Sequence, residues 1–247
     1  MKRIICVLAL VFSTQGYSNS TAELFKAGNE AYKAENYLEA VQIYDSLLSL
    51  NYESVDLYYN LGNSHYKQEN LGLAILNYER AARLNPNDED VQNNLNLARE
   101  AVLDKFETVP SSILKIIGMA TMKFFSPSTW AVMGIVFLFL MGGGVGLYFF
   151  TSQKRPGFVG GISFLILGGF SIAMAFSYSQ HLKNHVPAII ISDSSYVKSA
   201  PSETAEDVFI LHEGTKAEVQ DELEGWKKIR LIDGKLGWIE GGDLEEI

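Results

Sequence analysis

The sequence predicts a multidomain chain that joins an all-α helical-repeat array, two transmembrane helices and a small all-β barrel. Three observations lead to this prediction. Residues 21–54 and 55–88 align with each other at a period of 34 residues, and two long apolar stretches further along contain no charged residue. The last part of the chain, residues 188–247, consists of short apolar runs separated by glycine-containing turns. One folded domain is therefore expected before a membrane-spanning pair in the sequence, and another after it.

The repeats carry the clearest signal, because ten aligned positions are identical between the two copies. A unit of this length is a helical hairpin that buries its apolar face only by stacking on neighbours. Glycine inside a helix costs about 1 kcal/mol relative to alanine, so the pair Gly28 and Gly62 indicates close approach of helices. Ala40 and Ala74 repeat the same small-residue pattern. The two copies resemble the tetratricopeptide repeat along their whole length.

Two repeats are fewer than such arrays usually need, so the open end requires a cover. Beyond the second copy, apolar residues recur at steps of three and four, which is typical of a helix with one buried face. They are Val91, Leu95, Ala98, Val102 and Phe106. We therefore predict a capping helix at 89–106, which makes 21–106 one helical domain.

Residues 1–20 have the layout of a secretory signal peptide, with a basic start, a short apolar run and a small, polar tail. The only cysteine, Cys6, lies in that run, so the exported chain would contain no disulfide, catalytic thiol or cysteine-bound metal. The net charge of -9 argues against nucleic acid as a partner, because phosphate binding requires a basic surface.

Two stretches, residues 129–150 and 158–180, contain no charged residue. Each is long enough to cross a hydrocarbon core of about 30 Å as a helix. We therefore predict two transmembrane helices joined by a turn at residues 151–157. If the signal directs export, the turn is cytoplasmic, which suits Lys154 and Arg155. Both folded domains would then lie outside the cytoplasm.

Several features of the spans and their flanks allow two interpretations. The juxtamembrane segment 107–128 contains an apolar stretch with lysines that either lies along the membrane surface or forms a plain linker helix. Closely spaced glycines either pair the spans with another membrane protein or let the two spans pack on each other. They are Gly142, Gly146, Gly157 and Gly161. The spans lack ionisable residues, which argues against transport.

Two histidines follow the second span at a spacing of four residues, His181 and His185. This spacing allows both side chains to lie on one helix face as metal ligands. No third ligand is near them in the sequence, and histidines exposed at the membrane interface are the alternative.

Residues 188–247 predict a small β-barrel, because short strands alternate with turns such as Asp233-Gly234. The ordered motifs around Leu211–Thr215, Gly225–Arg230 and Asp233–Ile239 resemble a bacterial SH3-type domain. Such domains bind peptides or cell-wall material. Two tryptophans are candidates for the binding surface, with core packing as the alternative. They are Trp226 and Trp238.

The tetratricopeptide resemblance implies a peptide site in the groove of the array. Members that grip a terminal carboxylate combine asparagines with cations, and here only the asparagines are present, as Asn29 and Asn63. The other clamp positions hold uncharged residues, Phe25, Asn93 and Leu97, so a chain end is not the expected ligand. The asparagines could instead hydrogen-bond a peptide backbone, with Lys33, Lys67 and Tyr59 nearby. The alternative is that these residues are ordinary repeat consensus.

The sequence contains no recognisable nucleophile–base pair, metal cluster or phosphate loop, so we expect a protein that is not an enzyme and that needs no cofactor and no metal. The module order resembles the BatE-type members of the bacterial Bat aerotolerance proteins. That resemblance implies a scaffold in the bacterial cytoplasmic (inner) membrane, with both folded domains facing the periplasm. It also implies action with von Willebrand A-type Bat proteins and a MoxR-type ATPase in oxidative or envelope stress. A peptidoglycan-binding tether that acts through the β-barrel is the alternative function.

Overall fold

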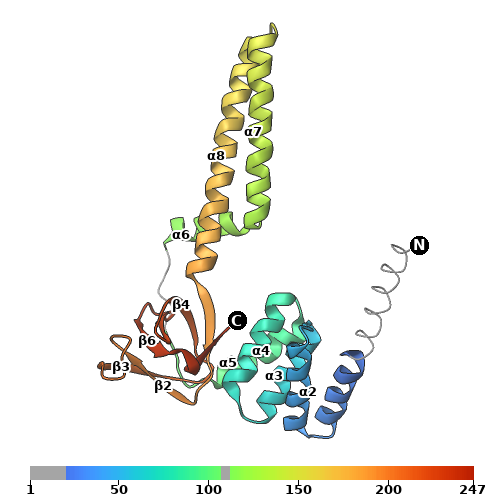
Figure 1. The fold of residues 1–247 in the computed structure, drawn as a ribbon, viewed down its shortest axis with the longest axis vertical. Coiled ribbons are helices and arrows are strands. Elements are labelled where there is room, and N and C mark those ends of the chain that lie inside the picture. Colours follow the sequence, from blue (N-terminus) through green and yellow to red (C-terminus); the bar gives the residue numbers. More distant parts are fainter. Residues whose placement is uncertain (1–20, 107–111) are drawn as a thin grey trace, which may run out of the picture. The chain divides into compact units, whose positions relative to one another are not determined.

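The computed structural model describes residues 21–106 and 112–247 (Figure 1). The predicted signal peptide, with Cys6, and the junction 107–111 lie outside the described residues. The chain forms two compact units. The first combines the helical repeats with Pro187–Ile247. The second lies between these two parts in the sequence and ends at Val186.

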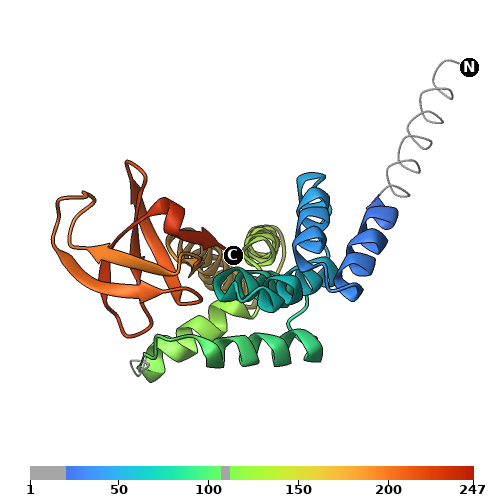
Figure 2. The same cartoon turned by 90° about the horizontal axis from the view of Figure 1, so that it is seen from below.

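The first unit begins with an array of helices that lie side by side (Figures 1 and 2). Residues 21–33 are helical and precede four further helices: α2 (Tyr37–Ser49), α3 (Val55–Lys67), α4 (Leu71–Leu84) and α5 (Glu89–Ala101). Ser54 caps α3 by accepting a hydrogen bond from Leu57 N, and Asp88 caps α5 in the same way. Positive φ angles of 62° at Glu35 and 66° at Glu69 mark equivalent tight turns in the two copies.

The repeat glycines bring paired helices close together, as the sequence predicts. A Cβ atom on Gly62 would lie 2.7 Å from the ring of Tyr78, and one on Gly28 would collide with Tyr44 in the same way. Both tyrosines are buried. The small residue in each copy is therefore required by the aromatic ring of the next helix.

The strands of the first unit form one seven-stranded sheet that curls on itself (Figure 2). The strands are β1 (Val186–Ile190), β2 (Ser194–Lys198), β3 (Asp207–His212), β4 (Lys216–Leu223), β5 (Trp226–Arg230), β6 (Leu236–Glu240) and β7 (Leu244–Glu246). Their order in the sheet is β3-β2-β6-β5-β4-β1-β7. Val197, Leu211, Ile229 and Ile239 are fully buried on its inner face. This is the small antiparallel barrel that the turn spacing predicts.

The array and the barrel share one hydrophobic core, which the sequence did not predict. Ile189 of β1 belongs to the same buried cluster as Ile75 of α4 and Leu95 of α5. Gly214, with φ 81°, would bring a Cβ atom to 2.8 Å from both Ile75 and Val102. The barrel therefore covers apolar surface of α4 that α5 alone was expected to cover.

The predicted capping helix is shorter than 89–106, because α5 ends at Ala101. Asp104, which follows the helix, contacts the barrel instead. Asp104 accepts hydrogen bonds from His212 N at 2.8 Å, from His212 Nδ1 at 2.9 Å and from Thr215 Oγ1 at 2.7 Å. These bonds lower the pKa of Asp104, although burial by itself raises it.

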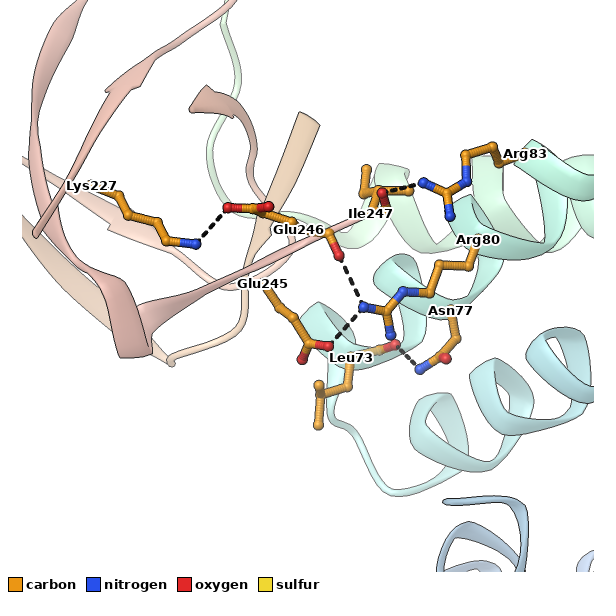
Figure 3. A network of polar contacts seen from close by, with 8 residues as sticks. All are labelled: Leu73, Asn77, Arg80, Arg83, Lys227, Glu245, Glu246 and Ile247. Atoms are coloured by element: carbon orange, nitrogen blue, oxygen red, sulfur yellow. Dashed lines mark hydrogen bonds and ion pairs between the residues drawn. The ribbon is translucent and has the colours of Figure 1, made fainter. Parts of the chain in front are cut away.

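Ion pairs across the same interface join α4 to the barrel. The buried carboxylate of Glu79 lies 2.8 Å from Lys216 Nζ and 2.6 Å from Arg99 Nη2. Next to it, Arg80 donates to Glu245 Oε1 at 2.7 Å and to the main-chain oxygen of Glu246 at 2.9 Å (Figure 3). The contacts of Glu79 with Lys216 and of Arg80 with Glu245 and Glu246 link residues more than a hundred positions apart, so the first unit behaves as one folded body.

The second unit consists of α6 (Ile113–Lys123), α7 (Pro127–Phe150) and α8 (Lys154–Asn184), and α7 and α8 form an antiparallel hairpin (Figure 1). Both hairpin helices are long and apolar enough to cross a membrane. The turn between them is shorter than the predicted 151–157, because α8 already begins at Lys154. Pro156 fits there because proline is tolerated in the first turn of a helix.

Of the four closely spaced glycines, Gly157 and Gly161 fit the interpretation in which the two spans pack on each other, and Gly142 and Gly146 do not. A Cβ atom on Gly157 would lie 2.6 Å from Tyr148 N, and Gly161 faces Gly144, so these glycines let the two helices pack on each other. Gly142 and Gly146 have nothing within 4 Å of an added Cβ atom. They do not contribute to the packing of α7 on α8.

We predict that Glu79→Gln destabilises the first unit by about 1.5 kcal/mol, because it removes a charged acceptor while both cations can still reach water. The pKa of Glu79 is lowered from 4.5: burial raises it, and Lys216 and Arg99 more than offset that rise. The unfolded chain therefore binds more protons, and the stabilisation is fully present above about pH 4.5 and lost as pH falls through the lowered pKa. Urea unfolding at several pH values measures this. The exposed Glu100→Gln is the control, and an equal loss in both variants would contradict the assignment.

Candidate functional site

A groove of about 260 Å³ on the array has both polar and apolar walls. It brings together three predicted site residues, Tyr59, Asn63 and Lys67. The other lining residues, which were not predicted as site residues, are Tyr32, Tyr66, Tyr78, Asn94 and Leu97. The predicted Asn29 and Lys33 are not among the lining residues, and Lys33 is exposed.

Each repeat holds its predicted asparagine by the same two hydrogen bonds. Asn29 Oδ1 accepts from Tyr44 OH at 2.8 Å and from Asn60 Nδ2 at 3.0 Å. The equivalent Asn63 Oδ1 accepts from a tyrosine hydroxyl at 2.7 Å and from an asparagine Nδ2 at 2.9 Å. The donors to Asn63 are Tyr78 and Asn94. The network thus recurs at the 34-residue period of the sequence.

The bonds leave a matched donor and acceptor in the groove. Because Asn63 Oδ1 is occupied by two donors, its amide is oriented and its N–H groups remain available; no partner for them occurs among the described residues. Asn94 Nδ2 donates to Tyr59 OH at 3.0 Å as well as to Asn63, which leaves its Oδ1 as an acceptor. A peptide unit offers one C=O and one N–H, so this pair suits an extended backbone.

The groove carries little charge, and its tyrosine hydroxyls are neutral. Burial raises the pKa of Tyr44 to about 12, and burial followed by neighbouring tyrosines raises that of Tyr78 further, so both hydroxyls stay protonated as donors. Among the described lining residues, Lys67 carries the only charge. Leu97, at a position where a carboxylate clamp has a cation, lines the groove and is exposed.

The two predicted tryptophans lie on the outer face of the barrel. Trp226 pairs with Glu240, and Trp238 pairs with Lys228, so both rings project from the face opposite to Ile229. Each ring is half-buried. Lys228 Nζ lies 6.0 Å from the centre of the Trp238 ring, a cation–π contact. The location of Trp226 therefore differs from the core-packing alternative.

Apolar neighbours extend this outer face. Tyr196 and Ile210 pair across β2 and β3, and Leu223 pairs with Trp226. The side chains of Tyr196, Ile210 and Leu223 are exposed. None of the barrel residues that contact the array in the interface described above belongs to this set. The tryptophan face, defined as Tyr196, Ile210, Leu223, Trp226 and Trp238, is thus separate from the interface.

The histidine pair after the second span forms a local contact. The rings of His181 and His185 lie 4.2 Å apart, and His185 Nδ1 lies 3.0 Å from the main-chain oxygen of His181. Within the described part of the chain, no group of three or more metal-ligating side chains occurs.

Comparison with known families supports the two resemblances. Residues 25–89 match a family model described as tetratricopeptide repeat, and residues 193–245 match one described as bacterial SH3 domain. The chain is therefore a two-module protein with a tetratricopeptide-type array and a bacterial SH3-type barrel. No curated protein matches it.

Several solved structures also match the chain. One is described as "Crystal structure of YrrB: a TPR protein with an unusual peptide-binding site". It is 19% identical, with 66% of this chain and 76% of that chain covered and a TM-score of 0.32.

We predict that Tyr78→Phe lowers the free energy of unfolding by about 1 kcal/mol, because Asn63 Oδ1 loses a donor in a partly buried site. Tyr44→Phe should have a similar effect, because it breaks the equivalent bond of the first repeat. Urea unfolding followed by circular dichroism provides the values. Tyr52→Phe, at an exposed position, is the control; stability unchanged in both repeat variants would show that the network is not formed.

Proposed function

We propose that this protein is a membrane-anchored, periplasm-facing scaffold that binds partner proteins. The observation that carries the proposal is the groove with its oriented asparagine pair, which is left open although the array packs against the barrel. The matches to two interaction modules support it. A scaffold of this kind requires no catalytic activity.

The groove binds an extended internal segment of a partner. Asn63 donates to a main-chain carbonyl and Asn94 accepts a main-chain N–H, while the tyrosines contact the side chains on either side. Lys67 favours a neutral or acidic segment over a basic one. A terminal carboxylate has no cluster of cations to pair with, because Phe25, Asn93 and Leu97 occupy the positions where a carboxylate clamp has them.

The two apolar helices hold the scaffold in the cytoplasmic membrane. The signal-like start and the even number of spans favour both folded modules on the periplasmic side, and Lys154 and Arg155 favour a cytoplasmic turn. The resemblance to BatE-type proteins suggests von Willebrand A-type membrane partners and, through them, a MoxR-type ATPase. A role in aerotolerance or envelope stress would follow from that complex.

We predict that Asn63→Asp reduces the recovery of cross-linked partners roughly tenfold, the equivalent of one strong hydrogen bond. The carboxylate keeps the acceptor for Tyr78 and Asn94 but removes the N–H donors. Cross-linking in membranes followed by mass spectrometry measures the yield. Asn96→Asp, on the exposed surface of α5, adds the same charge outside the groove and is the control.

Equal recovery with both aspartate variants would exclude the groove as the binding site. Recovery of the wild-type chain alone, under gentle cross-linking in its native membrane, would contradict the scaffold itself.

A second candidate function is a peptidoglycan tether, which the half-buried pair Trp226 and Trp238 on the outer face of the barrel favours. Aromatic rings on an open sheet face can stack on sugars. The match to a bacterial SH3 domain supports this candidate, because the resemblance implies peptides or cell-wall material as ligands. The acidic composition of the barrel argues against an anionic wall polymer. The tether would use the same face for uncharged glycan or peptide.

If the tether is correct, Trp226→Ala and Trp238→Ala each lower the fraction of the detergent-solubilised full chain that sediments with purified wall material. The full chain is required because Ile189 belongs to the core shared with the array, so the barrel alone would expose it. Ile232→Ala, at an exposed position away from the tryptophan face, serves as the control. A wild-type chain that stays in the supernatant would eliminate this function.

A further inference from the structure

The short helix α6 exposes large apolar side chains that no described residue of the second unit covers. Ile113, Ile116 and Ile117 follow the spacing of one helix face, and Phe124 continues that face just beyond the helix. Leu114 beside them is 83% exposed. An apolar face of this kind on an 11-residue helix is unfavourable in water.

A tryptophan fixes the end of α6 to the hairpin. Trp130, in the first turn of α7, is only 6% exposed, and its Nε1 donates to the main-chain oxygen of Met122 at 3.1 Å. Its ring packs edge-on against Phe125 at 5.2 Å and against Phe170 of α8 at 5.9 Å. The position of α6 relative to the two long helices is therefore defined by buried contacts.

These contacts put α6 at the end of the apolar part of the hairpin. Gly144 packs on Gly161 and Gly134 on Ile172, so the start of α7 lies beside the part of α8 that leads into Tyr178. There the uncharged stretch of α8 ends and polar residues follow. Figure 1 shows α6 lying across the foot of the hairpin instead of continuing along it. If α7 and α8 cross a bilayer, α6 lies at the depth of its interface.

The charge of α6 is consistent with that location. The helix contains no acidic residue, and its charged positions are lysines. Lys123, at its last turn, is exposed. A lysine at this depth can extend its ammonium group to lipid phosphates while its methylene stem stays in apolar surroundings.

We propose that α6 is an interfacial helix that lies in the headgroup boundary of the periplasmic leaflet, with Ile113, Ile116 and Ile117 turned toward the acyl chains. This proposal rests on the proposed membrane anchoring of α7 and α8. The lipid surface is its partner, and the helix fixes the depth at which the chain leaves the membrane.

The test uses the full chain with Cys6→Ser, reconstituted into vesicles of phosphatidylcholine and phosphatidylglycerol. Ile117→Cys and, separately, Leu114→Cys carry a nitroxide label on α6. Leu140→Cys in α7 is the reference for the bilayer core, and Asn96→Cys on α5 is the reference for water. Electron paramagnetic resonance measures collisions of each label with oxygen, which enters lipid, and with a nickel chelate, which stays in water.

The expected result is an oxygen-to-nickel ratio for both α6 labels that is shifted above that of Asn96 and below that of Leu140. Labels on α6 that match Asn96, or that collide with neither reagent because protein covers them, would overturn the interfacial helix while Leu140 still reports the core. A Leu140 label that behaves like Asn96 would instead overturn the membrane anchoring, and the interfacial helix with it.

Discussion

The arrangement of the first unit depends on one buried carboxylate, Glu79, which α4 holds between Arg99 of the array and Lys216 of the barrel. A carboxylate that is removed from water needs such partners, and here one of them comes from each module. In the same interface, Ile189 of the barrel packs into the hydrophobic core of the array. Together these contacts convert two modules, each common in separate proteins, into one body.

An array of only two repeats leaves apolar surface uncovered at its open end, and the packing of the barrel provides the cover. The barrel covers apolar surface at the end of the array, while the groove and the tryptophan face both remain accessible. If both surfaces bind as proposed, their fixed relationship would favour a partner, or a pair of partners, with matching spacing, because little conformational entropy is lost when the second contact forms. Independent modules on a flexible linker would not provide that selectivity.

The repeats, the apolar helices and the barrel were predictable because each follows from local pattern: the 34-residue period, long uncharged stretches and glycine turns. The second asparagine of each hydrogen-bonded pair, Asn29 with Asn60 and Asn63 with Asn94, had a signal that was missed. Asn60 and Asn94 are also 34 residues apart, so extending the period into α5 would have found them. The interface had no such signal. The contact of Lys216 with Glu79 joins residues 137 positions apart and depends on the folded surfaces of both modules.

The most direct test of this shared body is the distance distribution between nitroxide labels at Glu39→Cys on α2 and Glu222→Cys on β4, both exposed, in the full chain with Cys6→Ser. Double electron–electron resonance on the detergent-solubilised protein measures it. If the array and the barrel are one body, the distribution is narrow, and it broadens when Glu79→Gln is added. A broad distribution in the otherwise unaltered chain, unchanged by Glu79→Gln, would show that the two modules move independently and would contradict a shared core.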